Sequence, residues 1–324
     1  MFKAIIPAAG EGRRLRPHTH VRPKVMLEVA GKPIIGHIVD RVIKAGPEEV
    51  CVVVGYKADK VRSYLTANFD CRFSFVEQDD PKGLGDAVYR TRGCCDGSPV
   101  LVMLGDTIVD MDVADMVGGG DIIGVREVDD PRRFGVAELD GDFVTRLVEK
   151  PEEPRSNLAL VGVYHITDSG LLFRSLERLV SENRRTRGEY QLTDALQMMV
   201  ETGTSLRTYA VENWLDCGTP DALLDTNRYM LGHNGYSRPR EGAVLVPPVY
   251  VHDSAEIVNS VVGPHVSVGE NAKIRCSVIS DSIVNRDAAV DHALLRRSIL
   301  GEGCVVEEGP RSLNVGDLSE FRTD

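Results

Sequence analysis

The sequence predicts an α/β domain, in which helices flank a mainly parallel sheet, followed by a short parallel β-helix. Two patterns support this fold class. Up to about residue 232, short β-branched runs alternate with helical patterns, which is the order expected of β-α-β units. After Arg238-Pro239, aliphatic residues instead recur every five or six positions, which fits neither a helix nor a hairpin. The length of 324 residues is enough for about two domains.

Four apolar runs in the first part of the chain are predicted to be strands, at residues 4–7, 50–54, 73–76 and 100–104. Helices are expected between them. Pro33 lies where a helix can begin, and apolar residues then recur at helical spacing (Ile34, Ile35, Ile38, Val42 and Ile43); residues 59–67 and 84–92 repeat this pattern. Because ligands bind beyond the C-terminal ends of parallel strands, we expect a site where the first and fourth strands end.

The aliphatic repeat of the second part predicts a coil with flat sides. Its positions are Ile257, Val262, Val268, Ile274, Ile279, Val284, Val290, Leu295, Leu300 and Val306, and a small residue lies two positions before nine of these ten. Small residues are expected at tight corners, and ten sides at three per coil predict about three coils. A β-sandwich is the alternative, but its hairpin dipeptides are scarce here. We therefore divide the chain into residues 1–235, 236–310 and a polar tail, 311–324.

Composition argues against several classes of function. The chain carries 38 basic and 49 acidic residues, a net charge of -11, which disfavours a nucleic-acid or membrane partner. Its seven cysteines form an odd set without a C-x-x-C pair, which favours a reducing compartment over a disulfide or zinc framework. The sequence shows neither a signal-peptide core nor an apolar span of about 20 residues, so a cytoplasmic location is expected.

A loop rich in glycine and arginine, residues 10–24, follows the first strand. Gly10 and Gly12 allow the backbone to approach a ligand closely, and the loop holds five cations: Arg13, Arg14, Arg16, Arg22 and Lys24. Such a loop can surround a polyphosphate, so we interpret it as the catalytic centre. Leu15 replaces the third glycine of a dinucleotide loop, and no Walker-type Gly-Lys-Ser/Thr is present. A solvated basic turn is the alternative interpretation.

Two aspartates are candidate magnesium ligands. Asp106 follows the apolar run 100–105, so its carboxylate should emerge at the C-terminal end of a strand. Asp216 follows a short apolar stretch and precedes a Gly-Thr-Pro turn. Mg²⁺ binds one or two carboxylates and completes its shell with water and phosphate oxygens. For either aspartate, a helix cap or a turn is the competing interpretation.

Two further polar segments end strands. Glu149-Lys150 follows the run 144–148 and could hold polyol hydroxyls and a phosphate, or form an ordinary surface pair. Gln78 follows the run 73–77 and precedes Gly83-Leu84-Gly85; an amide beside glycine backbone can pair with a base edge, or cap a sheet. No histidine neighbours a serine or cysteine in a way that indicates a nucleophilic triad.

Taken together, these segments resemble the sugar-1-phosphate nucleotidylyltransferases over about residues 1–232. The resemblance is carried, in order, by the Gly10 loop, Pro23-Lys24, Gln78 with Gly83, Leu104-Gly105-Asp106, Glu149-Lys150-Pro151 and residues 214–218. The family's loop usually has threonine where this chain has Arg13. Residues 149–164 and 187–195 are similar to the glucose-1-phosphate thymidylyltransferase branch, whose longer members carry a left-handed β-helix.

The resemblance implies a Rossmann-like mixed sheet and transfer of a nucleotide from dTTP or UTP to a sugar 1-phosphate, with glucose 1-phosphate expected, at a Mg²⁺-dependent site. It implies that Arg14, Lys24 and Asp106 are catalytic and that Asp106 and Asp216 bind the metal. It assigns nucleotide contacts to Ala8, Ala9, Gly10, Gly12, Arg13, Gln78 and Gly83, and sugar-phosphate contacts to Gly135, Glu149, Lys150, Gly162, Tyr164 and Trp214.

Two other functions stay open. One is a regulatory subunit without turnover, which would have no need of the metal ligands. The other is a bifunctional enzyme whose β-helix transfers an acetyl group, with His252, His265 or His292 as base, although about three coils are few for that role. The β-helix is instead expected to support a homo-oligomer. The choice between thymine and uracil, and the identity of the sugar, stay open as well.

Overall fold

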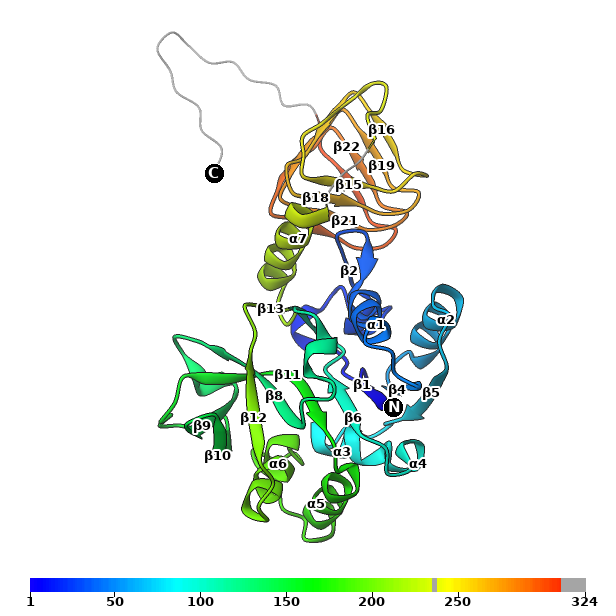
Figure 1. The fold of residues 1–324 in the computed structure, drawn as a ribbon. Helices are drawn as coiled ribbons and strands as arrows, with labels where there is room; N and C mark the ends of the chain where they lie inside the picture. Colours follow the sequence, from blue (N-terminus) through cyan, green and yellow to red (C-terminus); the bar gives the residue numbers. More distant parts are fainter. Residues whose placement is uncertain (235–237, 310–324) are drawn as a thin grey trace. The chain divides into compact units, whose positions relative to one another are not determined.

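The computed structural model describes residues 1–234 and 238–309 of the chain (Figure 1). It divides into two compact units, Met1–Thr226 and Asn227–Asp324. The polar tail expected at 311–324 lies outside the described residues. No helix in the described ranges has the length and apolar character needed to cross a membrane.

A mixed sheet of nine strands forms the centre of the first unit. Its order is β5 (Phe73–Glu77), β4 (Glu49–Val54), β1 (Lys3–Pro7), β6 (Val100–Met103), β11 (Leu158–Ile166), β8 (Asp121–Glu127), β12 (Leu206–Ala210), β10 (Phe143–Glu149) and β9 (Gly135–Asp140). The first four strands are parallel, whereas β11 runs antiparallel to both β6 and β8. The four predicted strands and the mixed sheet are therefore confirmed.

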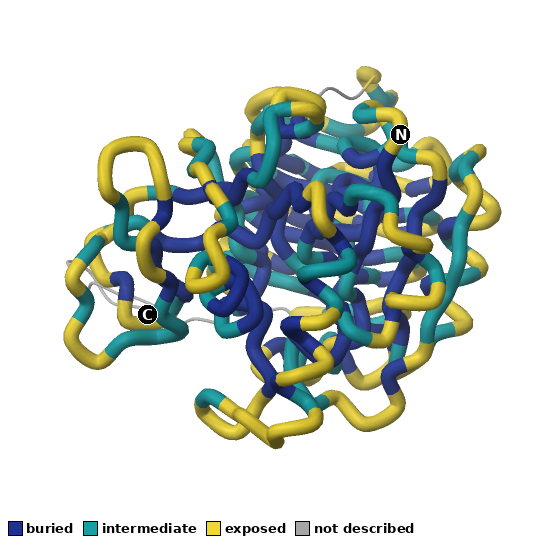
Figure 2. The backbone as a smooth tube through the Cα atoms, turned by 60° about the horizontal axis from the view of Figure 1, so that its bottom comes forward, coloured by how far each residue is buried: buried dark blue, intermediate teal, exposed yellow. Residues whose placement is uncertain are grey.

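Helices cover this sheet because its central strands are apolar on both faces. Every residue of β4 is buried, and Figure 2 shows buried backbone along the strands and exposed backbone in the connecting loops. The helices are α1 (Ile34–Lys44), α2 (Ala58–Asn68), α3 (Leu84–Arg90), α4 (Arg92–Cys95), α5 (Ser169–Ser181) and α6 (Leu192–Glu201). A further helix, α7 (Pro220–Asn234), begins at the end of the first unit and continues into the second. The helix predicted over 84–92 is interrupted at Thr91, whose hydroxyl bonds the Val88 carbonyl.

The second unit contains three parallel sheets of four strands each. These are β14 (Ala243–Leu245), β17 (Ser260–Val262), β20 (Val278–Ser280) and β23 (Leu294–Arg296); β15 (Val249–Val251), β18 (Val266–Val268), β21 (Ile283–Val284) and β24 (Ile299–Leu300); and β16 (Glu256–Val258), β19 (Lys273–Arg275), β22 (Ala289–Asp291) and β25 (Val305–Glu307). Strands from successive coils pair, as Ile257 does with Ile274 and Ile274 with Val290. This arrangement is consistent with the parallel β-helix predicted from the repeat, whose left-handedness stays a prediction.

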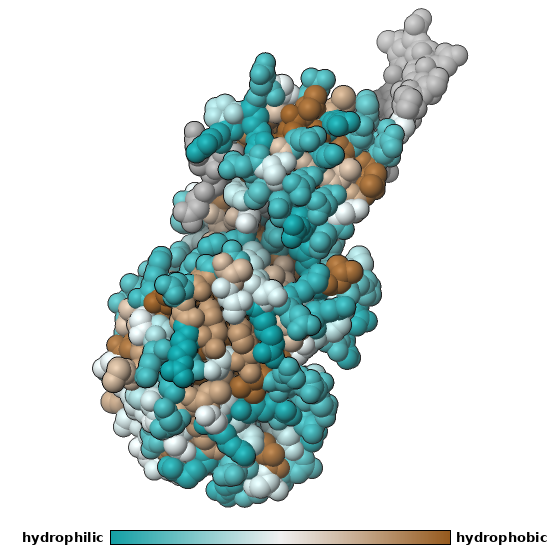
Figure 3. Space-filling view, turned by 90° about the vertical axis from the view of Figure 1, so that its right-hand side faces the viewer, coloured by the Kyte–Doolittle hydropathy of each residue, from teal (hydrophilic) through white to brown (hydrophobic). Residues whose placement is uncertain are grey.

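The prediction of about three coils was too low. Four strands in each sheet give four coils, because β14 and β15 precede Ile257, where the aliphatic count began. The side chains of the repeat fill the interior, as Val268, Ile274 and Ile279 are fully buried. Outside, the side chains of Val244, Val278 and Leu294 are largely exposed, and Figure 3 shows apolar patches among the hydrophilic side chains of this unit.

The corners explain why small residues recur. Asp281 adopts φ 47° and the next residue, Ser282, is buried inside the turn. The Ser282 hydroxyl donates to the Ser280 carbonyl at 2.6 Å and accepts from the backbone N–H of Ser298 at 3.0 Å. A larger side chain would displace the neighbouring coil, so the stacked corners restrict these positions to small residues.

His37 in α1 joins the helix to a hairpin next to the predicted catalytic loop. The hairpin comprises β2 (Glu28–Val29) and β3 (Lys32–Pro33), and the Nε2–H of His37 donates to the Val29 carbonyl at 2.9 Å. Burial lowers the pKa of His37 to about 4. The ring is therefore neutral at pH 7, while an unfolded histidine would begin to take up a proton near pH 6.5.

We expect the free energy of unfolding to fall as the pH drops from 6.5 towards 4. In that window the unfolded state binds a proton that folded His37 excludes. The contribution of neutral His37 to the free energy of unfolding is therefore fully present above pH 6.5 and is lost on acidification, by up to about 3 kcal/mol. Urea unfolding between pH 4 and pH 7.5 measures the slope. His37→Gln keeps a donor for Val29 but does not titrate, so the slope should be shallower. An identical slope in both proteins would exclude His37 as its source.

Candidate active site

Two cavities of the first unit adjoin at the loop that follows β1. The larger, of about 660 Å³, and the smaller, of about 560 Å³, share five lining residues: Lys24, Leu84, Leu104, Asp106 and Glu189. We call them the large cavity and the loop cavity. Because Lys24 and Asp106 belong to both, ligands in the two cavities would meet at these charged side chains.

The loop cavity contains the complete set of residues for which nucleotide contacts were expected: Ala8, Ala9, Gly10, Gly12, Arg13, Gln78 and Gly83. Gly12 has φ 69°, and a Cβ atom there would lie 2.7 Å from the Cβ of Lys24. Only glycine allows this approach without displacing Lys24. The loop is closed further by the Thr19 hydroxyl, which donates to the Gly12 carbonyl at 3.0 Å.

Three of the five cations of the loop line the cavities, namely Arg13, Arg14 and Lys24. Arg13 donates through Nε to Glu11 at 2.8 Å, and Arg16 lies 3.7 Å from the same carboxylate. The hydrogen bond from Arg13 holds the pKa of Glu11 below its usual range. Neither Arg16 nor Arg22 lines either cavity. Fewer cations than the predicted five therefore face the cavities, and the carboxylate of Glu11 offsets part of the positive charge of Arg13 and Arg16.

The structure places Arg14 in the large cavity and Lys24 in both. Arg14 belongs to a short 3-10 helix, η1 (Arg13–Leu15), whose last residue is fully buried and anchors the turn. Lys24 opens a second one, η2 (Lys24–Met26). The side chain of Lys24 is only 9% exposed, and its Nζ lies 2.7 Å from Oδ2 of Asp106, a carboxylate that is 42% exposed. This ion pair therefore has one buried partner and one partner open to the cavities.

A short antiparallel ladder brings the second aspartate close to the first. β13 (Asn213–Asp216) pairs with β7 (Thr107–Asp110), and the register sets Asp216 opposite Thr107, the residue after Asp106. Both aspartates line the large cavity. The Thr107 hydroxyl also donates to Oδ1 of Asp106 at 3.3 Å. Two carboxylates separated by 110 positions in the chain are thus neighbours at the end of the ladder.

Cys217 lies beside these charges and is fully buried. Burial raises the pKa of its thiol to about 12, with Asp106 and Asp216 acting in the same direction and Lys24 opposing them. A thiol with this pKa stays protonated at neutral pH. Cys217 is therefore a packing residue of the site, and its thiol does not act as a thiolate nucleophile.

The wall of the large cavity holds a carboxylate with two partners. Glu149 lies 3.0 Å from Lys150 Nζ through one oxygen and accepts from the Thr193 hydroxyl at 2.8 Å through the other. Gly135 and Tyr164 line the same cavity. Tyr164 is buried, and burial together with the nearby Glu149 raises the pKa of its phenol. The hydroxyl therefore remains a neutral hydrogen-bonding group.

Trp214 contributes an aromatic face and a buried donor to this wall. Its ring meets Phe134 edge-on, with the centroids 4.6 Å apart, and both residues line the large cavity. The indole N–H is buried and has no hydrogen-bond partner among the described residues. A buried donor without a partner is costly, so a ligand oxygen in this cavity would stabilise it.

Gly162 is the one expected site residue that lines neither cavity. It has φ 87°, and a Cβ atom there would lie 2.5 Å from a methyl group of Leu104. Leu104, which lines both cavities, stands in front of it. Gly162 therefore acts indirectly, by leaving space for Leu104.

Sequence reasoning missed several residues of the large cavity. These include Arg132, Arg133, Phe134, Arg187, Glu189, Gln191 and Thr193. A signal for the first pair was present in Asp130-Pro131-Arg132-Arg133, which forms a capped 3-10 turn before β9. Arg187 donates to the Lys150 carbonyl at 2.9 Å, so this arginine is tied to the segment that carries Glu149.

Comparison with known proteins agrees with this arrangement. Residues 3–232 match the family model described as nucleotidyl transferase. The chain is 30% identical to the low-salt glycan biosynthesis nucleotidyltransferase Agl11 of Haloferax volcanii, over 99% of this chain and 95% of that protein. It is 31% identical to a glucose-1-phosphate thymidylyltransferase of Streptomyces griseus, over 95% and 94% of the two chains.

A solved structure shares the fold over most of this chain. The structure of UDP-glucose pyrophosphorylase complexed with UDP-glucose superimposes with a TM-score of 0.63 at 26% identity, and covers 72% of this chain and 99% of that one. The matched family model, the relatives and the fold give one answer. The chain belongs to the nucleotidyl transferase family, among the sugar-1-phosphate nucleotidyltransferases.

Proposed function

We propose that the protein transfers a nucleotidyl group from dTTP or UTP to glucose 1-phosphate, forming an NDP-glucose and pyrophosphate. The observation that carries this proposal is the pair of cavities that adjoin at Lys24 and Asp106. A reaction between two phosphorylated substrates requires two adjacent binding sites with a cation at their junction. Relatives named as thymidylyltransferase and as UTP-glucose-1-phosphate uridylyltransferase support the choice of substrates.

The loop cavity suits the triphosphate and the large cavity suits the sugar phosphate. Backbone N–H groups near Gly10 and Gly12 can approach phosphate oxygens, while Gln78 and Gly83 lie where a base could be held. In the large cavity, Glu149 and Thr193 offer acceptors and a hydroxyl for the sugar. Lys150, Arg14 and Arg133 supply positive charge for its phosphate.

The reaction needs no nucleophile from the protein. An oxygen of the sugar 1-phosphate forms a bond to the α-phosphorus of the triphosphate, and the bond from that phosphorus to the bridging oxygen breaks, so pyrophosphate leaves with the electron pair. Both reagents are anions, so catalysis consists of neutralising charge and aligning the attack. Lys24 serves both tasks, because its ammonium group is buried at the junction and held in place by Asp106.

Asp106 and Asp216 have the donor chemistry that fits a magnesium ion. They supply carboxylate oxygens at one end of the β7–β13 ladder, within the large cavity, and Asp106 is open enough to accept a ligand. When bound, Mg²⁺ polarises the α-phosphate and screens the charge of the departing pyrophosphate. The two aspartates would hold the ion where the cavities adjoin.

A matrix of substrates tests the proposed function. The triphosphates dTTP, UTP, CTP, ATP and GTP are each combined with glucose 1-phosphate, galactose 1-phosphate and N-acetylglucosamine 1-phosphate, and pyrophosphate release is followed with and without Mg²⁺. Release should be fastest with dTTP or UTP and glucose 1-phosphate, and should stop when EDTA removes the metal. Absence of release from every combination would refute the proposal.

We expect Lys24→Ala and Asp106→Ala each to lower kcat by at least ~100-fold, since each removes one preorganised charge at the junction of the cavities. Steady-state pyrophosphate release measures the effect. Lys32→Ala is a matched control, because Lys32 also pairs with an aspartate, Asp40, but lines neither cavity. Normal turnover in a folded Lys24→Ala protein would exclude the proposed centre.

Asp216→Asn should raise the Mg²⁺ concentration needed for half-maximal activity by at least ~10-fold, because an amide oxygen is a weaker ligand than a carboxylate. A magnesium titration at saturating substrates gives this value. Asp110→Asn is the control: Asp110 lies at the other end of the same ladder and is exposed. Equal magnesium requirements in the two variants would remove Asp216 from the metal site.

A further inference from the structure

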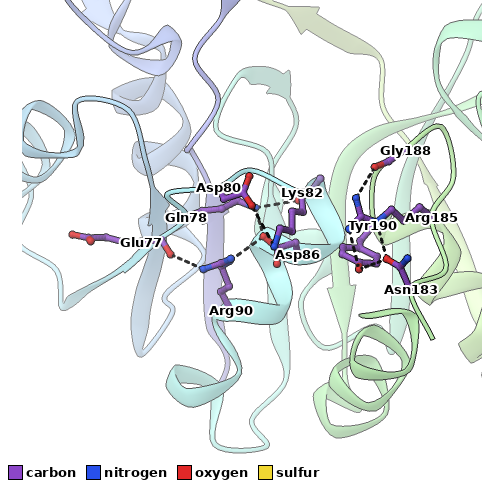
Figure 4. Close-up of polar contacts among 11 residues, drawn as sticks. Glu77, Gln78, Asp80, Lys82, Asp86, Arg90, Asn183, Arg185, Gly188 and Tyr190 are labelled. Atoms are coloured by element: carbon purple, nitrogen blue, oxygen red, sulfur yellow. Dashed lines mark hydrogen bonds and ion pairs between the residues drawn. The ribbon is translucent and has the colours of Figure 1, made fainter. Parts of the chain in front are cut away.

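The side-chain amide of Gln78 is held in one orientation by its neighbours. Gln78 is 5% exposed and lines the loop cavity. Its Nε2 donates to Oδ2 of Asp86 at 2.7 Å and to the Gly83 carbonyl at 3.3 Å (Figure 4). A carboxylate and a carbonyl only accept hydrogen bonds, so the NH₂ end of the amide must face them. The reverse orientation would set oxygen against oxygen.

Asp86 is itself fixed. Its side chain is 8% exposed, and Arg90, one turn later in α3, donates through Nε to the same Oδ2 at 2.9 Å. Arg90 also reaches the Glu77 carbonyl at 3.4 Å, on the strand that leads into Gln78 (Figure 4). The arginine compensates the charge of the buried carboxylate, which a buried anion requires. Asp86 is thus a stable acceptor at a fixed distance from Gln78.

The segment that carries Asp86 is clamped by a second loop. The Tyr190 N–H donates to the Lys82 carbonyl and the Tyr190 carbonyl accepts from the Gly85 N–H, both at 2.8 Å. The Tyr190 hydroxyl in turn donates to Asn183 at 2.8 Å, and Arg185 lies over the ring (Figure 4). Residues 82–85 are therefore held at both ends, and the start of α3 cannot move away from Gln78.

This arrangement leaves one atom of the amide for a ligand. Oε1 of Gln78 accepts no hydrogen bond in the described ranges of the chain, and it belongs to a side chain that lines the loop cavity. We propose that Asp86 is a positioning residue that sets the base preference, because it holds the Gln78 amide so that only the acceptor atom, Oε1, faces the base. The inference deepens the proposed function and rests on it.

An acceptor placed opposite N3 of a pyrimidine selects bases with a donor at that position. Thymine and uracil carry an N3–H that can donate to Oε1, whereas N3 of cytosine is an acceptor and would leave two lone-pair atoms facing each other. A buried site made to hydrogen-bond one ligand group rejects analogues that lack it, because its polar atom is then left unpaired. The site should therefore favour UTP or dTTP over CTP through Gln78, with Asp86 fixing the direction of the bond.

Asp86→Asn tests this role. An amide at position 86 carries no charge and can donate as well as accept, so only the longer bond to the Gly83 carbonyl still favours the wild-type orientation, and a fraction of the Gln78 amides turns to present Nε2 to the cavity. We expect the ratio of kcat/KM for UTP to that for CTP to fall by at least ~10-fold, with the KM for glucose 1-phosphate unchanged. A loss of general stability would lower both rates and leave the ratio where it was.

Glu77→Gln is the matched control. It makes the same chemical change on a neighbouring carboxylate, which pairs with Arg62 at 2.7 Å and is 59% exposed, and it should keep the wild-type ratio. Asp86→Ser, whose hydroxyl also donates and accepts, provides a second variant in case Asp86→Asn does not fold. A UTP to CTP ratio equal to or above that of the wild type in a folded variant at position 86 would overturn the inference.

Calorimetric titration separates this inference from the proposed function. UTP and CTP are titrated into the full-length wild-type and variant proteins without sugar phosphate. A wild type that prefers UTP in binding, with the preference reduced by Asp86→Asn, supports the role of Asp86 even if no pyrophosphate is released. Active wild-type enzyme whose nucleotide preference is unaffected at position 86 contradicts the inference and leaves the proposed function intact.

Discussion

The ion pair between Lys24 and Asp106 is the interaction on which the rest of the site depends. The two residues are 82 positions apart in the chain, and they meet because β1 and β6 are parallel neighbours in the sheet. The loops that follow these strands leave the same edge, and the Gly105 N–H donates to the Pro7 carbonyl at 3.0 Å. A buried lysine requires a partner, so the same contact that stabilises the fold also keeps a cation at the junction of two cavities. The stability of the fold and the proposed catalysis thus depend on the same pair of side chains.

The sequence predicts those parts of the site that depend on strand ends. Asp106 and Gln78 follow apolar runs, and parallel strands bring their C-terminal ends to one edge, so their convergence could be expected. The partner of Arg13 could not be predicted, because its pairing with Glu11 depends on how the loop folds. The proximity of Asp216 to Asp106 depends on an antiparallel ladder between strands of four residues each, too short for their pairing to be read from periodicity.

The repeat of the second unit could be predicted from the sequence, because its period depends on stacking between neighbouring coils. From Ile257 onward nine of ten sides combine an aliphatic residue with a small residue two positions before it, and Ile274, Ile279 and Ser282 are buried as this pattern requires. The first coil keeps the same spacing, because Leu245 and Val251 pair with Val262 and Val268 and precede Ile257 at intervals of six residues. Val249 takes the place of the small residue there, as its partner Val266 does in the next coil. The period therefore extends over all four coils, and the number of coils was underestimated because the count began at Ile257.

The two cavities are not independent of each other. Leu84 and Glu189 line both, and the backbone of Tyr190 links their segments through hydrogen bonds to residues 82 and 85. A ligand in either cavity therefore contacts the same clamped pair of loops. Because hydrogen bonds already join these loops, their conformational entropy is lost during folding. Substrate binding therefore does not have to order them. The net charge of -11 does not prevent the binding of anionic substrates, since a few cations fixed close to the ligand outweigh dispersed charges that solvent screens.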